Sequence, residues 1–101
     1  MNHLAVTCSL DAAAIDARRD ALLTDLVRRA EHREQLPAGY RLRFPATGDT
    51  LAAVARAVEA ERQCCRFLRF LITVEPDGGP ISLELAGPPG TGEFLRALLE
   101  A

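Results

Sequence analysis

The sequence has few cysteines and no long apolar stretch, and each lack excludes a class of protein. Three cysteines among 101 residues are too few, and odd in number, for a disulfide framework. Reduced thiols are typical of the cytoplasm, which is therefore the location we predict. No run approaches the ~20 apolar residues that a membrane-spanning helix requires. Segment 1–10 lacks a basic region followed by an apolar run, so we expect no signal peptide.

Basic residues are not in excess either, which argues against a nucleic-acid partner. Twelve basic residues stand against fourteen acidic ones, and the net charge is −2. A protein that binds nucleic acid usually shows a basic excess or a basic stripe. The arginines of the first half alternate with acidic residues, a pattern typical of a solvated helix face. We therefore expect no nucleic-acid partner.

The composition is that of a folded protein with one core. A hydrophobic content of 49% and a charged content of 26% are ordinary for a globular domain. The length suits a single domain, 1–101, which buries a core of its own. Such a domain needs no metal to fold, so any metal that it binds need not be structural.

The spacing of the apolar residues predicts an α+β domain. Strands are predicted at 4–8, 31–36, 40–44, 68–74 and 81–85, and helices at 12–33, from 47 or 49 to 66, and at 93–101. The segment 31–36 could instead extend the first helix. The order β-α-β-β-α-β-β-α predicts a mainly antiparallel sheet covered by helices on one face. Its middle part matches the split β-α-β unit of ferredoxin-like folds, so we expect a variant of that fold.

The adjacent thiols of Cys64 and Cys65 are the most unusual local feature. Cys65 continues the predicted apolar stripe of Leu51, Val54 and Val58, as an ordinary core cysteine would. Cys64 lies ~100° away around the helix and is the thiol that we expect to be accessible. A disulfide between the neighbours is disfavoured, because their α-carbons lie ~3.8 Å apart and a disulfide usually needs at least ~4.4 Å.

Two neighbouring reduced thiols suit a soft metal ion. Thiolates select ions such as Hg(II), Cu(I) and, less strictly, Zn(II). The flanking Arg62 and Arg66 would favour the thiolate form by their charge. In a regular helix the two sulfurs diverge, but at the end of a helix the backbone can bring them together. Cys8, just before the predicted first helix, is a third candidate ligand that would serve equally well as a core residue.

Other roles for nearby residues stay open. The C-x-x-C and H-x₃₋₅-H spacings of zinc sites are absent, so we expect His3 and His32 on the surface. Glu61 precedes the cysteines by one helical turn and shares their side of the helix. Its carboxyl group would either exchange a proton with a thiol or a metal-bound carbon, or pair with a nearby arginine.

The pattern E-x-x-C-C-x-F-L-x-F, from Glu61 to Phe70, resembles a group of small bacterial proteins associated with mercury resistance. The upstream C-x-L, from Cys8 to Leu10, and the apolar strand and proline turn at 81–89 also match that group. The resemblance implies a soft-metal role for Cys64 and Cys65. It specifies neither the metal nor a reaction.

The favoured interpretation is a cytoplasmic protein that binds a soft heavy metal, Hg(II) before Cu(I) or Zn(II), through Cys64 and Cys65 with Cys8 as auxiliary ligand. It requires no cofactor, and binding is preferred to catalysis. One alternative is a thiol-dependent enzyme, which would cleave an organomercurial with Glu61 as the acid or carry out thiol redox chemistry. Another is an interaction module with core cysteines. A homodimer would then form through an exposed sheet face that bears Arg41, Arg43, Ser82 and Glu84.

Overall fold

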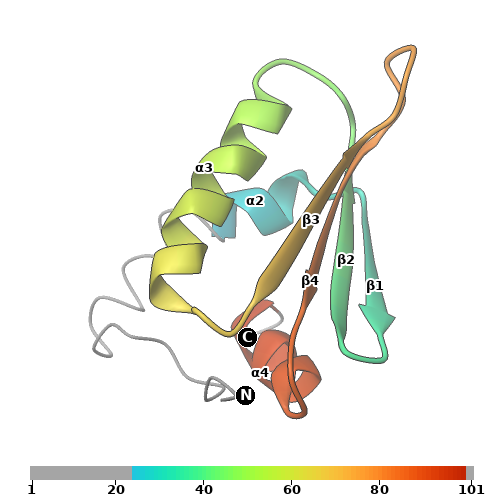
Figure 1. Ribbon diagram of the computed structural model, residues 1–101. Coiled ribbons are helices and arrows are strands. Elements are labelled where there is room, and N and C mark those ends of the chain that lie inside the picture. The colour runs from blue at the N-terminus through green and yellow to red at the C-terminus, as the bar shows by residue number, and fades with distance from the viewer. Residues whose placement is uncertain (1–23, 100–101) are drawn as a thin grey trace.

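The computed structural model describes residues 24–99, which form four strands and three helices (Figure 1). In chain order these are α2 (Thr24–Arg29), β1 (His32–Leu36), β2 (Gly39–Phe44), α3 (Thr50–Cys64), β3 (Arg69–Val74), β4 (Ile81–Ala86) and α4 (Thr91–Leu99). The predicted strand 4–8 and most of the predicted helix 12–33 lie outside the described residues. The α+β class is confirmed.

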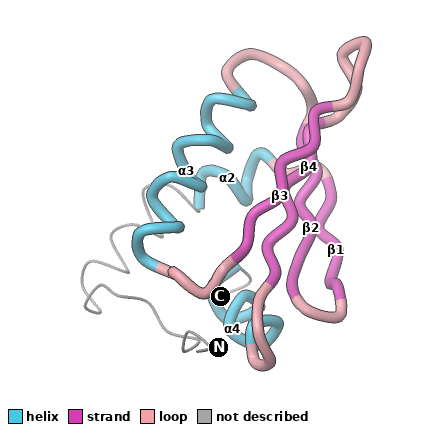
Figure 2. The backbone as a smooth tube through the Cα atoms, viewed as in Figure 1, coloured by secondary structure: helices cyan, strands magenta, loops and turns pink. Residues whose placement is uncertain are grey.

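The four strands form one antiparallel sheet in the order β1-β2-β4-β3 (Figure 2). Strands β2 and β3 are both antiparallel to β4, so they run parallel to each other on either side of it. The chain passes from β2 to β3 through α3, and this segment is a split β-α-β unit. The wider ferredoxin-like arrangement would require strands beyond this unit, and it stays a prediction.

The three described helices all cover the same face of the sheet, as the alternating pattern predicts (Figure 1). On that face the buried side chains of β2 and β4 meet in register, for example Leu42 opposite Leu83. Leu26 of α2, Val54 of α3 and Leu95 of α4 belong to the same core cluster. The other face is polar on its two central strands, whereas Leu71 of β3 lies on it and is 50% exposed. Its central strands bear the alternate residues Arg41, Arg43, Ser82 and Glu84.

The segment after α2 is a strand, and the helix ends at Arg29 instead of Arg33. The N–H group of Ala30 still donates to the carbonyl groups of Leu26 and Val27, at 3.2 Å each. The next N–H group, that of Glu31, donates instead to the carbonyl of Arg43 at 2.8 Å. The chain leaves the helix here because β2 provides a partner for its backbone.

The buried face of α3 is rotated from the predicted stripe. Val54 and Cys65 are fully buried as expected, but Leu51 is 44% exposed and Val58 is half-buried. The helix instead turns toward the core the side chains of Thr50, Ala53, Val54, Ala57 and Glu61. The distance between packed elements depends on the side chains at their contact, so small alanines let α3 lie close to the sheet.

An ion pair joins α2 to the start of α3. The Arg29 guanidinium donates to the Asp49 carboxylate at 2.8 Å, and Arg56 lies 3.7 Å from the other oxygen of that carboxylate. The hydrogen bond and the charge of Arg29 hold the pKa of Asp49 below its ordinary value of 3.8.

We therefore expect Arg29→Gln to raise the pKa of Asp49, measured by NMR titration of its carboxyl carbon. A folded pKa below the unfolded one means that the pair contributes to stability at neutral pH and that this contribution is lost as the pH falls through the folded pKa. The carboxylate is exposed, so added salt weakens the effect. Arg56→Gln serves as the control, since Arg56 is the weakest of the causes, and an equal shift in both variants would contradict the assignment.

Candidate functional site

Helix α3 ends within the cysteine pair. Cys64 is the last helical residue, and Cys65 is the C-cap, with φ −113° and ψ 78°. The N–H group of Cys65 still donates to the carbonyl of Glu61, at 2.6 Å. The helix therefore ends just before the predicted end near Arg66. The cysteine pair lies at the end of the helix, as expected.

The thiol of Cys65 and the carboxyl of Glu61 form a buried pair. Cys65 is 0% exposed and Glu61 3% exposed. The thiol donates to the Oε1 atom of Glu61, with 3.7 Å between sulfur and oxygen. The spacing of four residues brings them together, because such residues lie on one side of a helix. Two groups that can each hold a proton are thus in contact inside the protein.

The residues after the pair hold it in place. The carbonyl of Cys65 accepts a hydrogen bond from the N–H group of Leu68 at 3.1 Å, which closes a turn. Phe67 is buried and packs edge-on against Phe94 of α4, with 5.1 Å between ring centroids. Gly87 passes close to this turn: a Cβ atom there would lie 3.1 Å from the carbonyl oxygen of Phe67. Packing thus accounts for the buried Phe67 and Leu68 of the pattern E-x-x-C-C-x-F-L-x-F.

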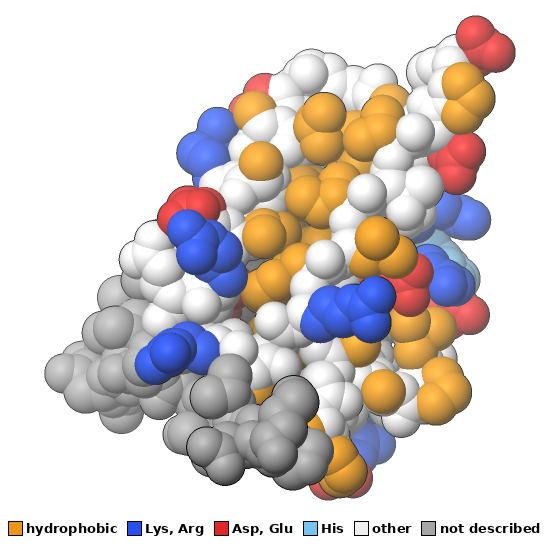
Figure 3. All heavy atoms as spheres, in the orientation of Figure 1, with side chains coloured by type: hydrophobic (Ala, Val, Ile, Leu, Met, Phe, Trp, Pro, Cys, Tyr) orange, Lys and Arg blue, Asp and Glu red, His pale blue; other side chains and the backbone are white. Residues whose placement is uncertain are grey.

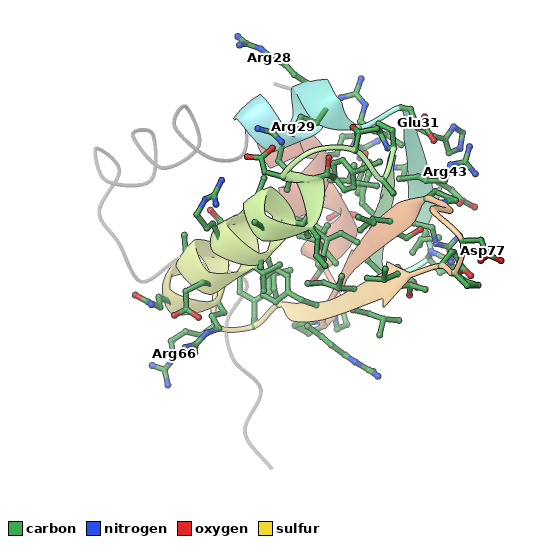
Figure 4. All side chains as sticks on the ribbon, turned by 90° about the horizontal axis from the view of Figure 1, so that it is seen from above. Arg28, Arg29, Glu31, Arg43, Arg66 and Asp77 are labelled. Atoms are coloured by element: carbon green, nitrogen blue, oxygen red, sulfur yellow. The ribbon has the colours of Figure 1, made fainter. Side chains whose placement is uncertain are left out.

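The flanking arginines point to solvent. Arg62 binds the carboxylate of Glu59 through two hydrogen bonds of 2.9 and 3.0 Å, and Gln63 donates to the same carboxylate at 2.8 Å. The bound carboxylate of Glu59 raises the pKa of Arg62. Arg66 is exposed and extends away from the body of the protein (Figure 4). The charge of Arg62 is thus shared with Glu59 on the exposed side of α3 instead of being directed at the Cys65 thiol.

Of the three candidate ligands, only Cys65 is described in full. Cys8 lies outside the described residues, and so does the side chain of Cys64. Convergence of three sulfurs on one ion therefore stays a prediction, as does the accessibility of Cys64. Within residues 24–99, no three side chains of histidine, cysteine, aspartate or glutamate cluster as metal ligands would. His32 is exposed, as expected, and His3 lies outside the described residues.

Sequence reasoning put Glu61 on the side of the helix that bears the cysteines and left open whether it exchanges a proton with a thiol or pairs with an arginine, but it missed the burial of Glu61 and its contact with Cys65. The available signal was the line of Ala53 and Ala57, which lie eight and four residues before Glu61 on the same side of the helix. These alanines are buried, and Glu61 continues their line into the core. The larger side chains of Leu51 and Val58 indicated a neighbouring stripe of the helix as the buried one instead.

No family model, no curated protein and no solved structure matches this chain. In the part of the chain that the structure describes, no helix is both long and apolar enough to cross a membrane.

Proposed function

We propose that this protein binds a soft heavy-metal ion, Hg(II) above Cu(I) and Zn(II), through the thiolates of Cys64 and Cys65, with Cys8 as an auxiliary ligand. One observation carries the proposal: a buried thiol at a helix end donates a hydrogen bond to a buried carboxyl, 3.7 Å away. A thiol must lose its proton when it binds a metal. Glu61 is placed to take that proton from Cys65.

The Glu61 carboxyl favours this proposal over simple core packing. A cysteine packs in a core as a small hydrophobe and needs no polar neighbour. Burying a carboxyl group costs free energy that an apolar side chain would not cost. A role in moving the proton of Cys65 gives a chemical reason for a glutamate at this position, where leucine or methionine would pack more favourably.

The location and the fold complete the proposal. Reduced thiols belong in the cytoplasm, where we place the protein. The balanced charge supports the view that nucleic acid is not its partner. The split β-α-β unit of β2, α3 and β3 supports a ferredoxin-like variant for the complete chain.

Native mass spectrometry of the reduced full chain, with Hg(II), Cu(I) and Zn(II) in competition, tests the proposal. The wild type should retain a single Hg(II), and the Cys64→Ser/Cys65→Ser variant should retain none. Cys8→Ser should bind Hg(II) more weakly if Cys8 is an auxiliary ligand. Circular dichroism confirms that each variant is folded. Equal uptake by the wild type and the double variant would refute the proposal.

A second function rests on the same contact between Cys65 and Glu61. In organomercurial cleavage, the thiolates would bind the mercury while the Glu61 carboxyl gives its proton to the carbon. The carbon–mercury bond then breaks, the hydrocarbon leaves, and Hg(II) stays on the sulfurs. Turnover of methylmercury that is lost in Glu61→Gln, while Hg(II) binding persists, would establish this reaction. Binding without turnover in the wild type would exclude it.

A further inference from the structure

Strand β3 lies at the edge of the described sheet and leaves apolar side chains exposed. It pairs with β4 on one side, and no other described strand lies along its outer edge. Leu71 is 50% exposed and Val74 55% exposed. In natural proteins an edge strand usually carries inward-pointing charges, prolines or bulges, and these features prevent it from pairing with another chain. Between Arg69 and Glu75 the sequence of β3 contains no charged residue and no proline.

An apolar surface continues from this edge onto α3. Figure 3 shows hydrophobic side chains gathered between α3 and β3, on the face that Figure 1 presents to the viewer. The larger side chains of this surface are Leu51 and Val58 on α3 and Phe70, Ile72 and Val74 on the helix-covered face of β3, all exposed or half-buried. Contiguous apolar surface beside a strand edge that no described strand covers is typical of an interaction site.

The sequence of β3 is complementary to itself. Phe70, Ile72 and Val74 lie on the helix-covered face, opposite Leu85, Leu83 and Ile81 of β4. Two antiparallel copies of β3 centred on Ile72 would place Ile72 opposite Ile72, and Phe70 opposite Val74. All the cross-strand pairs on the covered face are then apolar.

The same register brings opposite charges together at both ends. Arg69 of one copy lies opposite Glu75 of the other, and the two-fold axis repeats the pair. No ion pair in the described part of the chain engages either residue. If the register of the two strands shifted by one residue, side chains of the helix-covered face would lie opposite side chains of the other face. If it shifted by two residues, Arg69 would no longer lie opposite Glu75.

We propose that this protein forms a homodimer in which two β3 strands pair antiparallel about Ile72 and join the two sheets into one. The partner's α3 and β3 would cover the apolar surface beside β3. The polar face of the sheet is a poorer dimer interface, because its Arg41 already binds Glu34 at 2.7 Å and lies 3.6 Å from Glu84. The proposal is independent of the cysteines.

Light scattering during size-exclusion chromatography of the reduced full chain tests the dimer. The wild type should elute at about twice the chain mass of 11.0 kDa. Arg69→Glu and Glu75→Arg each create like-charge contacts at both ends, so each should raise the dissociation constant about tenfold or more. The double variant Arg69→Glu/Glu75→Arg restores opposite charges and should restore the dimer.

The matched control is Arg96→Glu, which makes the same charge change at an exposed residue of another element, α4, and should leave the dimer intact. Circular dichroism verifies that all variants fold, and Hg(II) retention by Arg69→Glu separates this proposal from that of metal binding. A monomeric wild type would overturn the dimer proposal, as would a dimer that resists both single charge changes. A dimer broken by Arg41→Glu instead would overturn it in favour of the polar sheet face.

Discussion

The Cys65 thiol of the folded, reduced protein is expected to react with iodoacetamide at least about a hundredfold more slowly than a thiol of the unfolded chain. Its side chain is 0% exposed, and its sulfur contacts Glu61, which is 3% exposed. Reagent can reach it only when the end of α3 opens locally. Quenched time courses followed by peptide mass spectrometry would measure Cys65 separately from Cys64 and Cys8.

The reference for this measurement is the same chain in denaturant, where all three thiols react at the rate of free cysteine. Alkylation of Cys65 at that rate in native buffer would contradict its burial. Under the proposed function Hg(II) binds the same sulfur, so its uptake should also stop accelerating at high metal concentration, when opening limits the rate. Slow alkylation alone also fits a core cysteine. A rise in melting temperature on adding Hg(II) distinguishes a metal ligand from a packing residue.

Phe44→Ala is expected to destabilise the fold by about 3–5 kcal/mol. The ring is 0% exposed, in the core cluster where the sheet meets the helices. Its removal leaves a cavity that the surrounding strands cannot close, because their backbones are paired on both sides of β2. Urea unfolding followed by circular dichroism measures the loss as a lower midpoint at an unchanged slope.

Leu51→Ala is the matched control for this loss, because it removes a large apolar side chain that is 44% exposed. We expect a cost of no more than about 1 kcal/mol, since part of the side chain already contacts water. Both substitutions are best compared in the Arg69→Glu background, so that association does not contribute. A loss at Leu51 as large as that at Phe44 would mean that the sequence-derived stripe of α3, and not the observed one, faces the core.

The contrast between these two residues shows where sequence reasoning succeeds and fails. Phe44 is the last residue of a strand in which apolar and charged side chains alternate. In such a strand the apolar residues all lie on one face, so the buried face is unambiguous. For α3, the large side chains of Leu51 and Val58 led to a predicted buried stripe that includes them. In the structure Ala53 and Ala57 are buried in the helix face that packs on the sheet. Alanine contributes little to a hydrophobic pattern in the sequence, but its small side chain allows a helix to pack closest to a sheet.

The turn between β3 and β4 was predictable for a local reason. Asp77 and Gly78 both have positive φ, 57° and 71°, and aspartate and glycine are among the residues that adopt this conformation most readily. The choice between helix and strand after Arg29 had no such local signal. It depends on the hydrogen bond from Glu31 to Arg43, a residue that is distant in the sequence.

By itself, then, the sequence determined the α+β class, the strands around Leu42, Ile72 and Leu83, and the spacing that puts Glu61 beside Cys65. These follow from local periodicity and from the geometry of a helical turn, which hold in any tertiary context. Only the tertiary structure decided that α3 ends between Cys64 and Cys65 and that Glu61 and Cys65 are buried together. The reason is physical: burial and the end of a helix depend on which distant surfaces pack against it, and no local pattern contains that information.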